Sequence, residues 1–238
     1  MKESAQAKKV RATNIIARLK KTYPDAHCEL DHSNPLELLL ATILSAQCTD
    51  KQVNIVTTDL FKKYRSALDF SNASLPQLEQ DVRRIGLFRN KAKNIQACCQ
   101  LLLEKHGGEV PRTMEELTGL PGVGRKTANV VLGNAYNINV GVVVDTHVAR
   151  LSEWLDFSRQ ISPEKIEMDL QKLVPQSDWT LFSHLLIWHG RRRCHARNPD
   201  CLNCEINADC PVGRKRPLSE ISGKAVRLDN QTRALKNA

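Results

Sequence analysis

Two kinds of segment are missing from this sequence, and each absence excludes a class of protein. No apolar run is long enough to cross a bilayer and none has the form of a signal peptide, so we expect no membrane partner and a cytoplasmic location. No stretch convincingly demands a sheet, and the β-branched run at 138–144 has no similar partner. We therefore predict an all-α fold in which residues 138–144 form a buried connection.

The composition is that of an ordinary globular protein with a basic surface. The 238 residues are 41% hydrophobic, enough for one large or two small domains that need no disulfides. In a reducing compartment eight cysteines favour metal binding. The net charge of +9 and the pI near 9.2 favour a polyanionic partner, although charge alone does not distinguish DNA from RNA or an acidic membrane surface.

The stretch 113–135 has the pattern of two helices joined by a glycine turn. Thr113 and Glu116 have the spacing of a capping box for the first helix. The second helix is predicted from apolar residues at helical spacing, namely Ala128, Val131, Leu132 and Ala135. A helix-hairpin-helix motif is therefore expected here.

The turn itself consists of Gly122, Val123 and Gly124. The two glycines can adopt positive φ and allow another backbone to approach closely. The amide groups and the positive dipole at the start of the following helix suit a phosphate. We predict that these three residues bind a nucleic-acid strand.

Lys126 and Asp145 are the candidate catalytic residues. Lys126 lies beside Arg125 at the positive end of a predicted helix, and both effects favour the neutral amine, which is a nucleophile. A solvated surface lysine is the ordinary alternative. Asp145 follows an apolar run and precedes a helical pattern, which predicts an N-cap, a role compatible with catalysis.

Two segments of the chain together resemble endonuclease III, a family of base-excision-repair glycosylases and lyases. Residues 120–132 read LPGVGRKTANVVL and residues 144–150 read VDTHVAR. The resemblance extends over roughly residues 8–215 and includes the cysteine pattern described below. It implies that Lys126 and Asp145 are the catalytic pair, and we expect His147 to line the pocket beside them.

Gln47 and Leu87 acquire a function only through this resemblance. From the sequence alone, Gln47 is a polar residue at a helix end, and Leu87 is the hydrophobic contact that follows a C-terminal cap at Gly86. The resemblance implies that Gln47 fills the gap left by a flipped-out nucleotide. It also implies that Leu87 is a wedge inserted into the base stack opposite the lesion.

Four cysteines follow the pattern C-x6-C-x2-C-x5-C, and they are Cys194, Cys201, Cys204 and Cys210. Four thiolates match the ligand number of an iron–sulfur cluster or a structural zinc. A zinc site usually has two close cysteine pairs and this pattern has one, which favours iron. The resemblance implies a [4Fe-4S] cluster, and the arginines around the first ligand are expected to offset its charge and contact phosphates. The other cysteines, Cys28, Cys48, Cys98 and Cys99, are predicted to be buried small apolar residues.

The resemblance also implies two helical domains around a DNA cleft. One comprises residues 30–140 with the helix-hairpin-helix motif at 113–135, and the other comprises residues 1–29 with 141–216 and carries the cluster. Residues 217–238 are polar, without apolar periodicity, and are predicted to be disordered.

The predicted function is that of a monomeric, bifunctional DNA glycosylase and AP lyase of the bacterial nucleoid. Its expected partner is double-stranded DNA containing damaged bases, mainly oxidised pyrimidines, or abasic sites. One alternative is a monofunctional glycosylase of the same superfamily, against which Lys126 argues. The other is a non-enzymatic iron–sulfur protein that binds duplex DNA.

Overall fold

The computed structural model describes residues 3–215, so the tail at 217–238 lies outside the described residues. Within 3–215 the backbone forms twelve α-helices and two short 3₁₀ helices, and no strand. The all-α prediction is therefore confirmed. Over the same range, none of the helices has the combination of length and apolar character that a membrane span requires.

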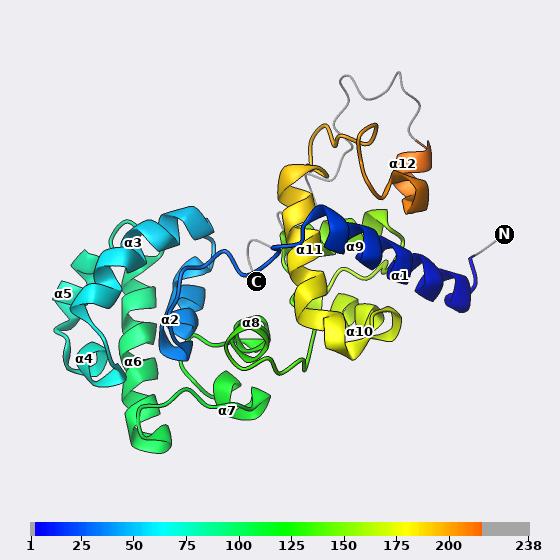
Figure 1. Cartoon of the computed structure of the whole chain (residues 1–238). Helices are drawn as coiled ribbons and strands as arrows, with labels where there is room; N and C mark the ends of the chain where they lie inside the picture. Colours follow the sequence, from blue (N-terminus) through cyan, green and yellow to red (C-terminus); the bar gives the residue numbers. More distant parts are fainter. Residues whose placement is uncertain (1–2, 216–238) are drawn as a thin grey trace. The chain divides into compact units, whose positions relative to one another are not determined.

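The chain divides into two compact units, each described here by itself. We call residues 28–140 the hairpin unit, and the described parts of 1–27 and 141–238 the cysteine unit. In Figure 1 the hairpin unit contains α2 to α8, and the cysteine unit contains α1 and α9 to α12. The first unit is continuous in sequence, whereas the second joins the N-terminal helix to the C-terminal part of the chain.

The hairpin unit is built around the helix α2. Its helices are α2 (Pro35–Ser45), α3 (Asp50–Lys63), α4 (Ala67–Asn72), α5 (Leu75–Asp81), α6 (Phe88–His106), α7 (Met114–Thr118) and α8 (Arg125–Ala135). Every residue from 38 to 44 in α2 is buried, because α3, α6 and α8 all pack against it. A helix that is apolar on all sides is stable only inside such a packing. Asn34 caps its start, with Oδ1 accepting a bond of 2.9 Å from the Glu37 amide, and Pro35 takes the first helical position as predicted.

Side chains cap the starts of two further helices of this unit. Thr49 caps α3, since Thr49 Oγ1 accepts a bond of 3.3 Å from the Gln52 amide, while Asp50 lies in the first helical turn. The helix α4 was not predicted. It begins with a capping box between Ser66 and Asp69, a pattern that the sequence does contain but in a segment too short for periodicity to show.

The cysteine unit packs its helices around α11. Its elements are α1 (Ala5–Thr22), α9 (Thr146–Trp154), α10 (Pro163–Leu173), η1 (Gln176–Asp178), α11 (Trp179–Arg192), η2 (Asn207–Asp209) and α12 (Pro211–Lys215). The core joins side chains from α1, α9, α10 and α11, such as Ile15, Val148, Leu170 and Phe182. The burial of each such side chain stabilises the fold by about 1.5–3 kcal/mol.

The segment 138–144 before α9 has no regular structure, as predicted, but only residues 141–144 are buried, whereas residues 138–140 are half-buried. Val142 and Val144 belong to the core of the cysteine unit. Between them, the Val143 amide donates a hydrogen bond of 2.9 Å to Ser183 Oγ on α11. Packing therefore holds the side chains of Val142 and Val144, and a hydrogen bond holds the amide of Val143. Together these contacts fix the backbone that leads into Asp145.

Candidate functional site

The helix-hairpin-helix motif is present, and its turn depends on Gly122. The φ angle of Gly122 is +77°, and a Cβ at this position would lie 3.0 Å from Asn94 Cβ on α6. Both the backbone conformation and the close approach therefore require glycine. Gly124 differs from it, because its φ is −94° and it forms the extended N-cap of α8.

A side-chain cap holds the start of the first helix of the motif, and a backbone hydrogen bond holds the turn. At the start of α7, Thr113 Oγ1 accepts a bond of 3.2 Å from the Glu116 amide, but the Glu116 carboxylate accepts from the Thr113 hydroxyl, so only half of the predicted capping box forms. The Val123 side chain is buried, and its amide donates to Leu120 O at 3.1 Å. Of the three predicted phosphate-binding residues, Gly122 and Gly124 are the ones that are exposed.

Lys126 lies in the exposed first turn of α8. No side chain caps this helix, because its N-cap residue is Gly124. Within the hairpin unit no hydrogen bond or ion pair engages the Lys126 amine, so no carboxylate of this unit neutralises it. The amine thus stands exposed at a helix N-terminus, without a carboxylate partner in its unit.

Asp145 caps α9, which confirms the predicted N-cap. Its Oδ1 accepts hydrogen bonds from the amides of His147 and Val148, at 2.9 and 2.8 Å. Both bonds go to the same oxygen, and Oδ2 takes no part in the cap. The carboxylate is therefore held in place through one oxygen while the other remains outside the capping interaction.

Gly190 and Arg150 join the start of α9 to the cysteine region, and neither was predicted to be a site residue, although Arg150 ends the VDTHVAR segment. A Cβ at Gly190 would lie 2.9 Å from His147 Nδ1, so glycine permits α9 and α11 to pack closely. Arg150 Nη2 donates to Gly190 O at 3.2 Å and to Cys194 O at 2.8 Å. The sequence offers one signal for Arg150, which is its helical spacing from His147. This spacing is equally compatible with an ordinary exposed arginine, so it does not predict the contacts.

Gln47 and Leu87 are exposed residues in left-handed backbone conformations. Their φ angles are +53° and +57°, and 59% of Leu87 is accessible to solvent. This conformation costs a residue with a side chain roughly 1–2 kcal/mol, so the surroundings must enforce it. The predicted cap at Gly86 is wrong, because positive φ falls on Leu87, which begins α6 instead of packing behind a helix end.

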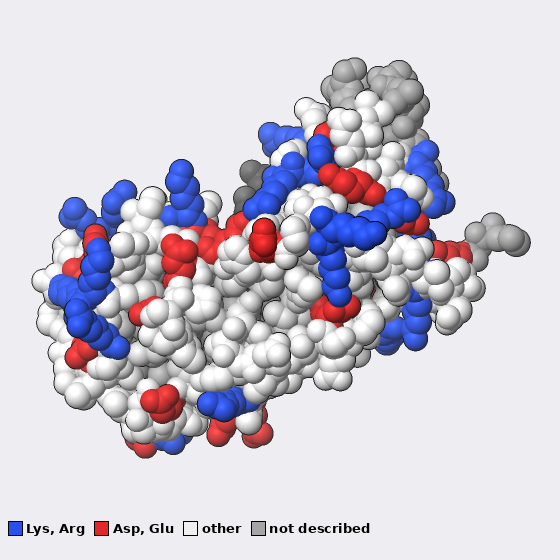
Figure 2. Space-filling view, in the orientation of Figure 1, with Lys and Arg blue, Asp and Glu red and all other residues white. Residues whose placement is uncertain are grey.

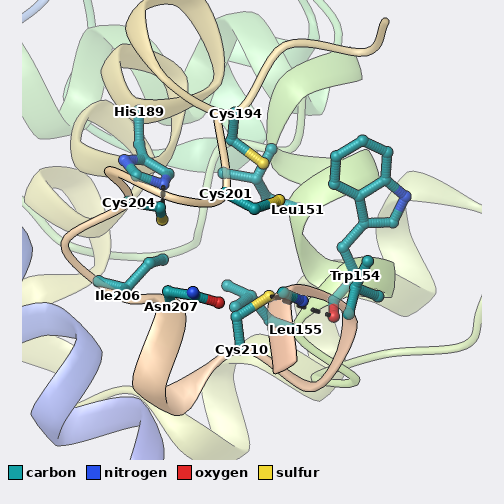
Figure 3. A pocket seen from close by; sticks show the side chains of 12 residues that line it. Leu151, Trp154, Leu155, His189, Cys194, Cys201, Cys204, Ile206, Asn207 and Cys210 are labelled. Atoms are coloured by element: carbon teal, nitrogen blue, oxygen red, sulfur yellow. Dashed lines mark hydrogen bonds between the residues drawn. The ribbon is translucent and has the colours of Figure 1, made fainter. Parts of the chain in front are cut away.

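The four C-terminal cysteines surround a cavity, shown in Figure 3. Cys194 follows α11, Cys201 and Cys204 lie in the next loop, and Cys210 lies between η2 and α12. The other lining side chains are mostly apolar, among them Leu151, Leu155, Ile206 and Val212. Within residues 3–215, no group of three or more His, Cys, Asp or Glu side chains is arranged to hold one metal ion.

Two of these thiols have nitrogen partners. The Gly213 amide donates to Cys210 Sγ at 3.3 Å, and His189 Nε2 lies 3.5 Å from Cys204 Sγ. Burial lowers the pKa of His189 to about 4, so its ring is neutral at pH 7. Tyr23 contacts the other ring nitrogen, His189 Nδ1, at 3.1 Å.

The loop that carries the cysteines is held by arginines. Arg193 forms ion pairs with Asp200 at 2.6 Å and with Glu205 at 3.0 Å, which close the loop on itself. Arg11 of α1 donates to Asp209 O at 3.2 Å. Figure 2 shows basic side chains lying beside acidic ones on the face drawn, so part of the positive charge is already paired. Arg193 in particular is engaged within the protein.

Cys98 and Cys99 are buried as predicted, with the pKa of Cys98 raised to about 12 by desolvation. Cys28 and Cys48 are only half-buried, so the prediction was wrong for them. Both lie near the ends of connecting segments, where packing is less complete than inside α6.

Comparisons with known proteins agree with the resemblance. Residues 40–176 match the HhH-GPD superfamily of base excision DNA repair proteins. The chain is 52% identical over 205 residues to endonuclease III of Synechocystis sp. (strain ATCC 27184 / PCC 6803 / Kazusa), covering 86% of this chain and 94% of that relative. Two solved structures, a non-covalent endonuclease III–DNA complex and a trapped endonuclease III–DNA covalent intermediate, are each 48% identical with a TM-score of 0.83. The alignments cover 87% of this chain and 97% or 98% of those chains. The chain therefore belongs to the endonuclease III family, within the HhH-GPD superfamily of base excision DNA repair proteins.

Proposed function

We propose that Lys126 and Asp145 carry out the DNA glycosylase and AP lyase reactions that this family membership assigns to the chain. The observation that carries the proposal is the Asp145 carboxylate, which is held by two amides through Oδ1 and keeps Oδ2 outside the cap. Lys126 supplies the matching nucleophile, an amine without a carboxylate partner in its unit. A relative trapped as a covalent intermediate with DNA supports a nucleophile on the enzyme.

The reaction begins at a nucleotide flipped out of duplex DNA. The neutral Lys126 amine attacks C1′, and the bond from C1′ to the base breaks, with its electron pair leaving on the base. The nitrogen then loses a proton and the C1′–O4′ bond breaks, so that the sugar ring opens, O4′ becomes a hydroxyl and C1′ forms an imine with the lysine. The imine acidifies the proton at C2′, and loss of that proton expels the 3′ phosphate by β-elimination. Asp145 accepts the proton that the lysine must lose and stabilises positive charge on the sugar.

The substrate class follows from the family, and a panel of duplexes tests it. We propose double-stranded DNA with one damaged, mainly oxidised, pyrimidine or one abasic site as substrate. Each duplex in the panel carries a single defined lesion, and both base release and strand cleavage are measured. A monofunctional glycosylase would release bases and leave strands intact, and a non-enzymatic DNA-binding protein would do neither.

Gln47 and Leu87 are proposed to contact the DNA at the flipped nucleotide, with Gly122, Val123, Gly124 and His147 as further contacts. Two neighbouring residues with exposed side chains and strained backbones fit insertion into a base stack. Val123 would act only through the shape of the turn, because its side chain is buried.

Replacing Gln47 or Leu87 by alanine is expected to reduce lesion processing more than binding to undamaged duplex. Each side chain offsets part of the unstacking cost, so the single-turnover excision rate should fall roughly tenfold while affinity for undamaged DNA stays close to the original. Leu68→Ala is the control, since Leu68 is 54% exposed on α4 of the same unit. Equal losses on both kinds of DNA would remove the proposed role.

We propose that Cys194, Cys201, Cys204 and Cys210 hold a [4Fe-4S] cluster. The residues present fit it, because four thiols line one mostly apolar cavity and match the ligand number of such a cluster. When bound, the cluster would act as a structural cross-link between the end of α11 and the following loop. It is expected to take no part in the steps at Lys126.

Purified protein is expected to be brown, with about four irons per chain, and Cys201→Ser should lose most of both. Loss of this ligand should also weaken DNA binding, because the loop would no longer be fixed. Iron content and visible absorption measure the first effect. Cys28→Ser is the control, since Cys28 lies outside the cavity. Colourless protein with one zinc would contradict the assignment.

The remaining proposals concern organisation. We propose that residues 30–140 and residues 1–29 with 141–216 are the two domains, that the protein acts as a monomer, and that it works at the bacterial nucleoid. Light scattering measures the mass of the free protein and of its complex with one lesion duplex, and so tests whether the protein is a monomer in both.

A further inference from the structure

Lys91 is a buried cation that the proposed reaction does not use. Only 4% of this residue is accessible to solvent, although it lies near the start of the otherwise amphipathic α6. Its Nζ donates to Leu44 O at 2.9 Å and also to Ala46 O. Both carbonyls belong to the C-terminal end of α2, where a cation is electrostatically favoured.

Burying Lys91 is energetically costly, because no carboxylate in the described part of the chain contacts its amine. Desolvation lowers its pKa, and among the described residues its amine contacts the two carbonyls and no carboxylate. An apolar side chain of similar length would fill the same volume without this cost. What the amine adds to an apolar side chain of this length is its hydrogen bonds, which fix the two carbonyls.

The same residue lies next to both segments that carry the proposed DNA-inserting side chains. Gln47 directly follows Ala46, one of the two acceptors. On the other side, the Lys91 amide donates to Leu87 O at 3.1 Å. The segments themselves are close, since a Cβ at Gly86 would lie 3.9 Å from Gln47 O. Lys91 thus holds one segment through its side chain and the other through its backbone.

We infer that Lys91 is a positioning residue whose side chain fixes Gln47 in its left-handed conformation, beside Leu87, for insertion into DNA. The inference rests on the function proposed above for these two residues. It explains how the strained, exposed Gln47 keeps one conformation without DNA, because the carbonyl that precedes Gln47 is bonded to the Lys91 amine. The bond from the Lys91 amide to Leu87 O is the first backbone hydrogen bond of α6, and it does not depend on the side chain. Lys91 itself does not touch the DNA.

The test uses Lys91→Met, which keeps the length and removes the donor. Its single-turnover excision rate on a one-lesion duplex should fall roughly 10- to 100-fold, because a displacement of about 1 Å at a positioning residue costs this much. Affinity for undamaged duplex should change little, since the phosphate contacts remain. Lys93→Met, on the exposed side of the same helix, should behave like the unmodified protein.

A double-mutant cycle separates positioning from a general loss of stability. If Lys91 acts through Gln47, then Lys91→Met should cause little further loss in a Gln47→Ala background. Multiplicative losses would overturn the inference and leave the role of Gln47 intact. A Gln47→Ala protein with full excision would instead overturn the proposed role of Gln47, and the inference with it. Should Lys91→Met fail to fold, Lys91→Arg enters the same cycle, and multiplicative losses there count equally against the inference.

Discussion

Lys126→Ala is expected to abolish the protein–DNA adduct that borohydride traps on a lesion duplex. Borohydride reduces an imine between a protein amine and C1′, and without the Lys126 amine no such imine forms. Strand cleavage should fall by roughly a thousandfold or more, because base release and β-elimination both lose their nucleophile. The adduct is measured as a shifted band on a denaturing gel.

Arg125→Ala is the matched control for this experiment. Arg125 is the neighbouring exposed cation in the first turn of α8, so its loss removes a similar charge without removing the nucleophile. We expect weaker DNA binding and an intact adduct. An adduct that survives Lys126→Ala would show that another amine is the nucleophile and refute the assignment. Base release without cleavage by the unmodified protein would instead favour a monofunctional glycosylase.

The parts of this structure that depend on local chemistry were predictable. Asn34 and Pro35 mark the start of α2, and Asp145 marks the start of α9, because a capping side chain bonds to amides only two or three residues away. The absence of a strand at 138–144 was also predictable, since a single β-branched run has no strand partner. Such features are decided by near neighbours in the sequence.

The left-handed conformations of Gln47 and Leu87 were not predictable in this way. Sequence rules assign positive φ to glycine, and Gly86 stands beside Leu87, yet the glycine is not the residue with positive φ. For Gln47, the contact that we infer to be decisive comes from Lys91, whose side chain reaches carbonyls more than forty residues away in sequence. Local propensity carries no information about such a contact.

The candidate site shows the same division. Lys126, Asp145 and the four cysteines could be chosen as site residues from motifs. The contacts of Gly190 and of Arg150, which ends the VDTHVAR segment, could not be predicted in this way. Their importance arises from the packing of α9 against α11, which allows Arg150 to bond to Gly190 O and Cys194 O. A residue whose partners are backbone carbonyls on another helix leaves no pairwise pattern in the sequence.

Asp145→Asn is expected to bind lesion duplexes almost normally and to process them slowly. Asparagine caps a helix about as well as aspartate, so its side-chain oxygen can accept from the His147 and Val148 amides and preserve the start of α9. What changes is the second position, where an uncharged amide replaces Oδ2. Loss of the charge and of the proton acceptor should lower the single-turnover rate by roughly 10²- to 10⁴-fold.

Asp145→Ala separates capping from chemistry. This variant loses both oxygens, so it should lose about 1 kcal/mol of stability as well as the rate, whereas Asp145→Asn should lose the rate alone. Thermal unfolding and excision are therefore measured on both proteins. If Asp145→Asn kept the original rate while Asp145→Ala was slow and unstable, Asp145 would be only a helix cap, and the carboxylate that accepts the proton from Lys126 would have to be another one.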